Sequence, residues 1–447
     1  MSNSKVMIIG AGLCGTLLGI RLAQRGHRVQ IFEKRSDMRR ADTEAGRSIN
    51  LALSNRGLRA LRMVGLEGAV SEHCIPMYGR MIHSTTGELR FSKYSGREGE
   101  HINSISRSGL NVALLDAAEG MENLELHFEH QCLEVDLPAA RARFRVGERE
   151  HEVRADVIFG ADGAGSAVRR SMMARTNELL FNYSQFFLRH GYKELTIPPG
   201  PGGSYRIEKN ALHIWPRGTY MLIALPNLDG SFTVTLFHPF EGRQGLKALT
   251  TRRKVLDFFE AQFADIIPHV PGLLTDFFAN PNSNLGTIRC YPWQAYGKAL
   301  LMGDASHAIV PFYGQGMNSS FEDVVVFDQV LDTHPNNWAR ALEAFQEQRV
   351  GDTNAIADLA VDNFYEMRDH VANPAFIRKR HLEMQLEQTY PDYFSKYSMV
   401  TFNEHLPYRE ALRKGRRQDE LLMDIVEEQG DRDLDLARVW EKVRNLA

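Results

Sequence analysis

Apolar and polar positions in the first 33 residues predict a strand, a turn, a helix and a second strand. Lys5–Ile9 is a short apolar run typical of a buried strand. Three leucines then recur at helical spacing up to Gly26, where we expect the helix to end. Residues 29–32 predict a strand parallel to the first, with Glu33 at its carboxyl end. Together these segments form a βαβ unit of about 30 residues.

Further along the chain the hydrophobic pattern changes twice. Residues 71–99 and 176–287 carry period-two alternation, clearest at 220–225 and 231–237, which predicts a mostly antiparallel sheet. From about residue 316 the pattern is helical to the end, apart from a Pro- and Tyr-rich stretch near 390–408.

These patterns predict an α/β fold, α+β overall, in which a Rossmann-type domain is interrupted by an antiparallel substrate domain and followed by helices. We expect the Rossmann-type domain to be discontinuous. The expected divisions are 1–70, 100–175 and 288–345 for this domain, 71–99 and 176–287 for the substrate domain, and 346–447 for the C-terminal helical region.

Composition narrows the possible partners. A net charge of −3 over 447 residues gives no electrostatic case for nucleic acid or an anionic membrane. No apolar run approaches the roughly 18 residues that a spanning helix needs, so we expect no membrane anchor. The four cysteines lack zinc-site spacing, and we expect no metal and a reduced, cytoplasmic protein that is a monomer or homodimer.

The turn after the first strand reads Gly10-Ala11-Gly12-Leu13-Cys14-Gly15. In such a GxGxxG turn the first glycine permits a tight bend, the second admits a pyrophosphate, and the third lets helix and strand pack closely. The helix N-terminus that follows favours phosphate, and Glu33 is placed to accept both hydroxyls of an adenosine ribose. The alternative is an incidental glycine turn, which the flanking strand, helix and Glu33 disfavour.

Two more motifs follow downstream. A strand predicted over 154–159 leads into Gly160-Ala161-Asp162-Gly163, although an Asp there could simply cap the next helix. A buried strand at 299–302 leads into Gly303-Asp304, where Asp304 is placed to bind a ribityl chain. The loop that ends in Gly314-Gln315-Gly316 then opens a helix predicted over 319–331, whose positive end would face a flavin pyrimidine. All three motifs in this order indicate FAD.

The three motifs resemble the single-component flavoprotein aromatic hydroxylases, the p-hydroxybenzoate hydroxylase-like group. Four segments are similar, more narrowly, to the kynurenine 3-monooxygenase family. They run over residues 46–54, 78–83, 311–318 and 397–402, and the last lies where the wider group diverges. The resemblance implies that NADPH reduces FAD and that O₂ then forms a flavin C4a-hydroperoxide, which hydroxylates L-kynurenine to 3-hydroxy-L-kynurenine.

The resemblance also implies the substrate contacts. Arg80 and Tyr94 would hold the carboxylate of kynurenine, and Asn363 and Tyr397 would reach in from the C-terminal helices. A bidentate Arg with a neutral Tyr donor suits a carboxylate. Arg80 and Tyr94 lie on two predicted strands around residues 85–88. A three-residue loop places them on one side of the hairpin, whereas a two-residue turn places them on opposite faces.

The remaining candidate residues come partly from the motifs and partly from the resemblance. Pro311 and Phe312 would line the space above the flavin and form the catalytic wall. His307 is read as structural rather than as an acid or base. The motifs themselves indicate cofactor contacts at Gly10, Gly12, Leu13, Gly15, Glu33, Asp162, Gly163, Asp304 and Gly316. The resemblance adds flavin contacts at Ala52, Arg107, Leu133, Met317 and Asn318.

Other functions stay open on the sequence alone. The nearest is a related flavin hydroxylase of another aromatic acid, such as a salicylate or kynurenate. A flavin halogenase is disfavoured because the chain lacks a WxWxIP-type motif. A non-catalytic FAD-binding protein would be yellow without consuming NADPH, and an inert scaffold would not bind FAD at all.

Overall fold

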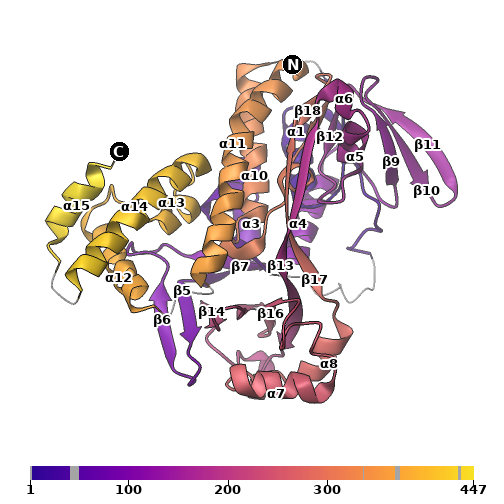
Figure 1. Ribbon diagram of the computed structural model, residues 1–447. Coiled ribbons are helices and arrows are strands. Elements are labelled where there is room, and N and C mark those ends of the chain that lie inside the picture. Colours follow the sequence, from indigo (N-terminus) through magenta and orange to yellow (C-terminus); the bar gives the residue numbers. More distant parts are fainter. Residues whose placement is uncertain (1–2, 41–49, 336, 368–372, 431–433, 447) are drawn as a thin grey trace.

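The computed structural model describes residues 3–40, 50–335, 337–367, 373–430 and 434–446. Figure 1 shows three regions: a nucleotide-binding region with the long helices α10 and α11, a lower sheet flanked by α7 and α8, and a group of C-terminal helices at the side. Of the stretch 46–54 that resembles the family, residues 46–49 lie outside the described residues.

The first region is built on a six-stranded sheet in the order β18-β19-β12-β1-β2-β8. Four neighbouring pairs, from β19 to β8, run parallel, as the βαβ pattern predicts. The predicted strand over 154–159 is wrong in detail, because β11 ends at Arg154 and a new strand starts at Val157. The strands are β1 (Lys5–Ile9), β2 (Arg28–Phe32), β8 (Leu124–His127), β12 (Val157–Gly160), β18 (Gln294–Ala295) and β19 (Ala299–Leu301).

Helices and two small sheets complete this region. A three-stranded sheet joins β3 (Asn50–Leu53), β7 (Ile102–Ser106) and β4 (Ile75–Met77), and another joins β9 (Gln131–Asp136), β10 (Arg141–Val146) and β11 (Arg149–Arg154). The helices are α1 (Leu13–Gln24), α2 (Asn55–Val64), α3 (Glu67–Ser71), α4 (Arg107–Glu119), α5 (Ala167–Met173), α6 (Thr176–Leu179), α9 (Asp304–His307), α10 (Gly316–Thr333) and α11 (Trp338–Tyr365), with the 3-10 turn η3 (Pro311–Tyr313).

The second sheet has seven strands in the order β17-β13-β16-β15-β14-β5-β6. All but one neighbouring pair are antiparallel, and β14 runs parallel to β5. Segments far apart in sequence therefore share one sheet, as the alternation predicts. Its elements are β5 (Gly79–His83), β6 (Leu89–Lys93), β13 (Asn182–Ile197), β14 (Ala211–Pro216), β15 (Met221–Pro226), β16 (Phe232–Pro239) and β17 (Ser283–Tyr291), flanked by α7 (Arg252–Gln262), α8 (Leu273–Ala279) and the short turns η1 (Pro201–Gly203) and η2 (Ile267–His269).

The hairpin of β5 and β6 settles the loop alternative. The Ser84 N–H donates to the Glu88 carbonyl, which leaves three residues in the loop. Arg80 is directly opposite Ser92, and the Tyr94 N–H donates to the Tyr78 carbonyl. Arg80 and Tyr94 are therefore diagonal neighbours on one face of the hairpin rather than a directly opposed pair.

The C-terminal region is helical, as predicted. It consists of α12 (Pro374–Thr389), α13 (Lys396–Thr401), α14 (Tyr408–Gln429) and α15 (Leu436–Arg444). Two predictions need correction. Helix α10 begins at Gly316, three residues earlier than expected, because the glycine turn itself forms the first helical turn. A short helix, α13, also interrupts the stretch 390–408 that we expected to be irregular.

A buried ion network joins these helices. The Asp323 carboxylate of α10 accepts from the Gly303 N–H at 3.0 Å, from His307 Nε2 at 2.6 Å and from Arg349 Nε at 2.9 Å. Arg349 Nη1 also donates to Glu322 at 2.9 Å, and Glu322 pairs with Arg56 of α2. Burial alone would raise the pKa of Asp323, but His307 and Arg349 bring it below its usual value. The network therefore fixes α10 against its neighbours.

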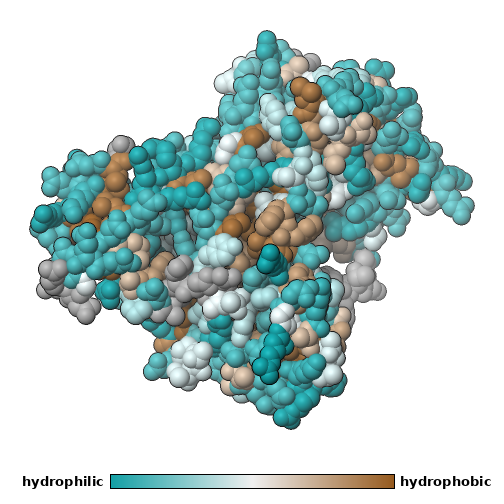
Figure 2. All heavy atoms as spheres, viewed as in Figure 1, coloured by the Kyte–Doolittle hydropathy of each residue, from teal (hydrophilic) through white to brown (hydrophobic). Residues whose placement is uncertain are grey.

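Within the residues that the structure describes, no helix is both long enough and apolar enough to cross a bilayer. On the face drawn in Figure 2 the surface is mostly hydrophilic, with hydrophobic residues in small separate groups.

Replacing Arg349 should destabilise the protein strongly. We expect Arg349→Met to lower the free energy of unfolding by about 3–5 kcal/mol, because two buried carboxylates, Glu322 and Asp323, each lose a charged hydrogen-bond partner. The measurement is urea unfolding followed by circular dichroism. Because the folded pKa of Asp323 is depressed, its contribution is present at neutral pH and is lost as the pH falls through that value.

Arg340→Met provides the matched control on the same helix. Arg340 pairs with Glu343 at 3.0 Å, but both side chains are well exposed. Its loss should cost less than about 1 kcal/mol. Equal effects of the two substitutions would contradict a stabilising role for the buried network.

Candidate active site

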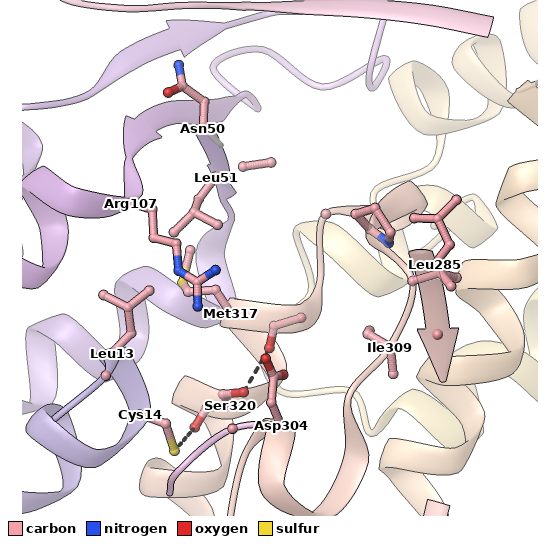
Figure 3. Close-up of a pocket in the computed structure, with 18 of the residues that line it drawn as sticks. Leu13, Cys14, Asn50, Leu51, Arg107, Leu285, Asp304, Ile309, Met317 and Ser320 are labelled. Carbon is pink, nitrogen blue, oxygen red and sulfur yellow. Dashed lines mark hydrogen bonds between the residues drawn. The ribbon is translucent and has the colours of Figure 1, made fainter. Parts of the chain in front are cut away.

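A cavity of about 900 Å³ lies between the nucleotide-binding sheet, the seven-stranded sheet and the C-terminal helices. Figure 3 shows a close-up of the cavity, where Leu13 and Cys14 of α1, Arg107 of α4, and Asp304, Met317 and Ser320 lie around one space. The residues that line the cavity come from all three predicted motifs and from the β5–β6 hairpin. The fold thus brings together groups more than 300 positions apart in the sequence.

The glycine turn leaves room for a ligand at its middle residue. Gly10 has φ +109°, and a Cβ there would lie 2.5 Å from the Ala161 carbonyl oxygen. A Cβ on Gly15 would lie 2.0 Å from the Gly10 oxygen, so helix and strand meet there. A Cβ on Gly12 would meet no atom within 4 Å. The space beside Gly12 is the space that a pyrophosphate needs at the uncapped N-terminus of α1.

Glu33 stands where β2 ends. One carboxylate oxygen accepts from the Ala11 N–H at 3.1 Å, and the other accepts from Arg35 Nε at 2.9 Å and from the Arg35 N–H at 3.0 Å. Burial alone would raise the pKa of Glu33, but Arg35 lowers it below its usual value. Glu33 is therefore an ionised acceptor at the cavity wall, as a ribose contact requires.

Asp162 and Asp304 supply two further carboxylates. Asp162 Oδ2 accepts from the Ala167 N–H at 2.6 Å, but its buried Oδ1 has no hydrogen-bond partner among the described residues. Burial raises the pKa of Asp162. Asp304 begins α9 directly after Gly303, whose φ of +59° turns the chain at the end of the strand. Both residues line the cavity and can accept from ligand hydroxyls.

The N-terminus of α10 also faces the cavity. No side chain caps this 18-residue helix, and its first turn contains no acidic residue. Gly316, Met317 and Ser320 line the cavity. The free N–H groups and the helix dipole therefore offer a partial positive charge to an electron-rich ligand.

Three side chains form a recognition cluster at the other side of the cavity. The rings of Tyr94 and Tyr397 are stacked with centroids 5.3 Å apart. The Arg80 guanidinium carbon lies 5.6 Å from the Tyr94 ring centroid and 5.0 Å from that of Tyr397. Arg80 Nε and the Tyr94 hydroxyl are buried and make no hydrogen bond to the described residues. Both are free to donate to an anion.

The phenols of this cluster stay protonated. Burial, and to a smaller extent Tyr397, raise the pKa of Tyr94 well above its usual range, against a lowering effect of Arg80. Burial likewise raises the pKa of Tyr397 and of Tyr313, whose ring stacks on Tyr397 at 5.6 Å. These groups therefore act as neutral hydrogen-bond donors and not as bases.

Most predicted site residues line the cavity, and four do not. Those that do include Ala52, Arg107, Gly163, Pro311 and Phe312, besides the residues described above. Gly15, Leu133, Asn318 and Asn363 are absent from the lining, although Gln131 and Cys132, next to Leu133, belong to it.

Two of these four support the walls instead. Asn318 accepts from the Ser54 N–H at 3.0 Å and donates to the Ala52 and Gly314 carbonyls, so it joins two lining segments. Asn363 donates to the Phe312 carbonyl at 2.7 Å. In this structure Asn363 holds the loop behind the cavity, and its direct contact with a substrate stays a prediction.

Sequence reasoning missed the apolar wall of the cavity. Alternate residues of two adjacent strands point into it: Met221, Ile223 and Leu225 from β15, and Thr233, Thr235 and Phe237 from β16. The alternation was visible in the sequence, but nothing there identified the face that meets the ligand. His307, in contrast, is buried against Asp323, which agrees with a structural role.

The residues present fit FAD. The cavity lining contains an open space at Gly12, an ionised Glu33, the orphaned Asp162 oxygen, Asp304 and the α10 N-terminus. Each matches a part of the dinucleotide, from adenosine ribose to the flavin ring.

Comparisons with known proteins agree with this geometry. A model of the FAD binding domain family matches residues 3–182 and 264–357. Among solved structures, a tetrameric 2-methyl-3-hydroxypyridine-5-carboxylic acid oxygenase is similar over 86% of this chain and 98% of its own, with a TM-score of 0.68 and 20% identity. PqsL of P. aeruginosa covers 81% of this chain and 99% of its own, with a TM-score of 0.65 and 21% identity. These structures show the fold.

Curated relatives extend the likeness across nearly the whole chain. The kynurenine 3-monooxygenase of Myxococcus xanthus is 45% identical over 445 residues, which is 98% of this chain and 95% of the relative. That of Dictyostelium discoideum is 42% identical and covers 96% and 94%. With a dinucleotide site and a buried Arg–Tyr cluster in one cavity, and identity at this level over both, the chain belongs to the kynurenine 3-monooxygenase family of FAD-binding proteins.

Proposed function

We propose that this protein is a FAD- and NADPH-dependent monooxygenase that converts L-kynurenine and O₂ to 3-hydroxy-L-kynurenine, in tryptophan degradation or NAD biosynthesis. One observation carries the proposal: Arg80, Tyr94 and Tyr397 form a cluster with unsatisfied donors in the cavity that the dinucleotide motifs also line. The names of the curated relatives support the same substrate and reaction.

The proposed cofactor contacts are the predicted ones. Gly10, Gly12, Leu13, Gly15 and Glu33 would hold the ADP part, and Asp162 and Gly163 would also contact FAD. Arg107 and Leu133 would contact the flavin. Asp304, Gly316, Met317, Asn318 and Ala52 would hold the ribityl chain and flavin. When bound and reduced by NADPH, FAD supplies the activated oxygen for the reaction.

The chain's own residues would recognise and orient the substrate. Arg80 can offer two N–H donors to the kynurenine carboxylate, and the neutral Tyr94 and Tyr397 hydroxyls can add to them. The aromatic ring would then lie along the apolar wall of β15 and β16, toward Pro311 and Phe312. Asn363 would fix that loop through the Phe312 carbonyl. Anchoring one end of the substrate in this way sets which ring carbon is presented for hydroxylation.

No strong base is needed for this reaction. The ring amine of kynurenine already enriches the adjacent ring carbon in electrons, so the substrate need not be ionised. The tyrosines around Arg80 agree with this, because burial keeps them protonated. Phe312 and Tyr313 are buried, and together with the half-buried Tyr397 they exclude water from the reacting region.

The proposal also includes the domain boundaries, the cellular location and the oligomeric state. It keeps the division into a FAD-binding domain (1–70, 100–175, 288–345), a substrate domain (71–99, 176–287) and a C-terminal region (346–447). The grouping of strands β5, β6 and β13–β17 in one sheet supports this division. A cytoplasmic location and a monomer or homodimer are part of the same proposal.

NADPH oxidation tests the function directly. We expect L-kynurenine to stimulate NADPH oxidation by the FAD-loaded protein strongly, with a product heavier by one oxygen. The measurement is absorbance at the NADPH band, with mass spectrometry of the product. Stimulation without an oxygenated product would make kynurenine an effector. Without any stimulation the assignment would move to another aromatic acid, and a panel of salicylate and kynurenate would identify it.

Arg80→Ala should weaken kynurenine binding. The loss of a charged hydrogen bond costs about 1.5–3 kcal/mol, which corresponds to roughly 10- to 150-fold in the dissociation constant. Titration followed by flavin fluorescence measures it. Arg90→Ala is the matched control, because Arg90 is exposed on the same hairpin and does not line the cavity. Unchanged affinity in Arg80→Ala would remove this residue from the site.

Tyr94→Phe isolates the hydroxyl from the ring. The ring keeps its stacking on Tyr397, so the substitution removes one neutral donor whose loss costs about 0.5–1.5 kcal/mol. We expect kynurenine to bind roughly 2- to 12-fold more weakly, with unchanged FAD affinity. Tyr78→Phe, on an exposed tyrosine of the same hairpin, should leave both affinities unaltered.

A further inference from the structure

The two tyrosines of the recognition cluster come from segments that are far apart in the sequence. Tyr94 follows the last residue of β6, and Tyr397 is the second residue of α13. Their rings are nevertheless stacked almost parallel, at an interplanar angle of 8°. Something must therefore hold the two segments in register, and helix α12 lies against both of them (Figure 1).

One buried carboxylate of α12 contacts both segments. Glu387 Oε2 accepts from the Gly96 N–H at 2.8 Å and from the Ser95 hydroxyl at 3.1 Å, directly after Tyr94. Glu387 Oε1 accepts from the Ser395 N–H at 3.0 Å, two residues before Tyr397. Ser395 in turn caps α13, since its hydroxyl accepts from the Ser398 N–H. We call this set of bonds the Glu387 bridge.

Arg380, two turns earlier on the same helix, contacts the same segments. Its Nη2 donates to the Tyr94 carbonyl and, at 3.3 Å, to the Lys93 carbonyl. Its Nη1 lies 3.5 Å from the Ser395 hydroxyl. Burial alone would raise the pKa of Glu387, but Arg380 and the N–H donors lower it. The carboxylate is thus ionised and can accept at both oxygens at neutral pH.

The backbone at Gly96 packs closely against helix α12. A Cβ on Gly96 would lie 2.3 Å from the Met384 carbonyl oxygen and 3.1 Å from Glu387 Cβ. The backbone after Tyr94 therefore touches the backbone of α12, and any side chain at 96 would separate them.

We propose that Glu387 is a positioning residue of the active site: by bonding Ser95, Gly96 and Ser395 it sets the distance between Tyr94 and Tyr397 and thereby the affinity for the substrate carboxylate. Glu387 lies outside the lining that the described residues give the cavity, so it acts through the two tyrosines. The inference rests on the proposed function for the identity of the substrate. The geometry of the bridge does not depend on it.

Glu387→Gln tests the bridge with little change of shape. Each carboxylate oxygen accepts from a backbone N–H, and an amide nitrogen cannot accept, so glutamine must lose the bond to the Gly96 N–H or to the Ser395 N–H. We expect the KM for L-kynurenine to rise about five- to tenfold. The kcat should stay within about twofold, since the chemistry at the flavin is untouched. FAD affinity should not change.

Two further variants separate positioning from stability. Gly96→Ala keeps the carboxylate but forces the segment away from α12, and it should raise KM in the same way. Leu422→Ala loosens the packing of α14 on α12 without touching the bridge, since Leu422 is buried beside Leu382 and Leu386. It should lower Tm and leave KM unchanged. An equal rise in KM for Leu422→Ala and Glu387→Gln at similar Tm would overturn the proposal.

Hydrogen exchange measures the bridge without any substrate. In Glu387→Gln, amide exchange should accelerate around residue 96, around residue 395, or in both segments, and in Leu422→Ala it should not accelerate in either. Unchanged exchange in Glu387→Gln would refute the bridge, and faster exchange with unchanged KM would refute its effect on the site. If the unmodified protein shows no kynurenine-dependent NADPH oxidation, the proposed function fails, while the exchange result still decides the bridge.

Discussion

The Asp323 carboxylate is the constraint on which the cofactor side of the site depends. It binds the Gly303 N–H, His307 and Arg349 at once, so the third motif, the helix α10 that lines the cavity and the long helix α11 share one buried anion. Removing two charges from water is costly, and the geometry must be good for such a group to be tolerated. Here the opposing charges bring its pKa below the usual value despite full burial. The N-terminus of α10 is aimed at the cavity because this network fixes the helix.

The proposed substrate side depends on a second buried carboxylate, Glu387. The two carboxylates differ in how far apart in the sequence their hydrogen-bond partners lie. Gly303, His307 and Asp323 lie within about 20 residues of one another, whereas Ser95 and Glu387 are 292 positions apart. The proposed substrate cluster therefore includes a residue of the C-terminal helices, Tyr397, whereas the dinucleotide motifs include none.

Sequence alone predicted the parts of the site whose chemistry is local. Gly10, Gly12 and Glu33 are separated by one βαβ unit, and steric and electrostatic rules fix what such residues do there. The hairpin left one alternative, because the sequence around Thr86 and Gly87 does not decide between two and three loop residues. The start of α10 was placed three residues late, since the glycine turn at Gly316 was interpreted as loop but forms the first turn of the helix.

The sequence could not predict contacts between residues that lie far apart along the chain. Asn363 carries a side chain suited to a substrate, yet its amide is engaged by the Phe312 carbonyl. The alternation of residues in β15 and β16 predicts the two strands correctly. Which face of these strands lines the cavity depends on how the sheet packs against helices far away in the sequence. Glu387 sits in a helix with no motif at all. A polar residue in such a helix is normally solvated, and only its burial between Ser95 and Ser395 reveals that its charge is used. Positioning residues are therefore found by asking where each buried charge finds its partners.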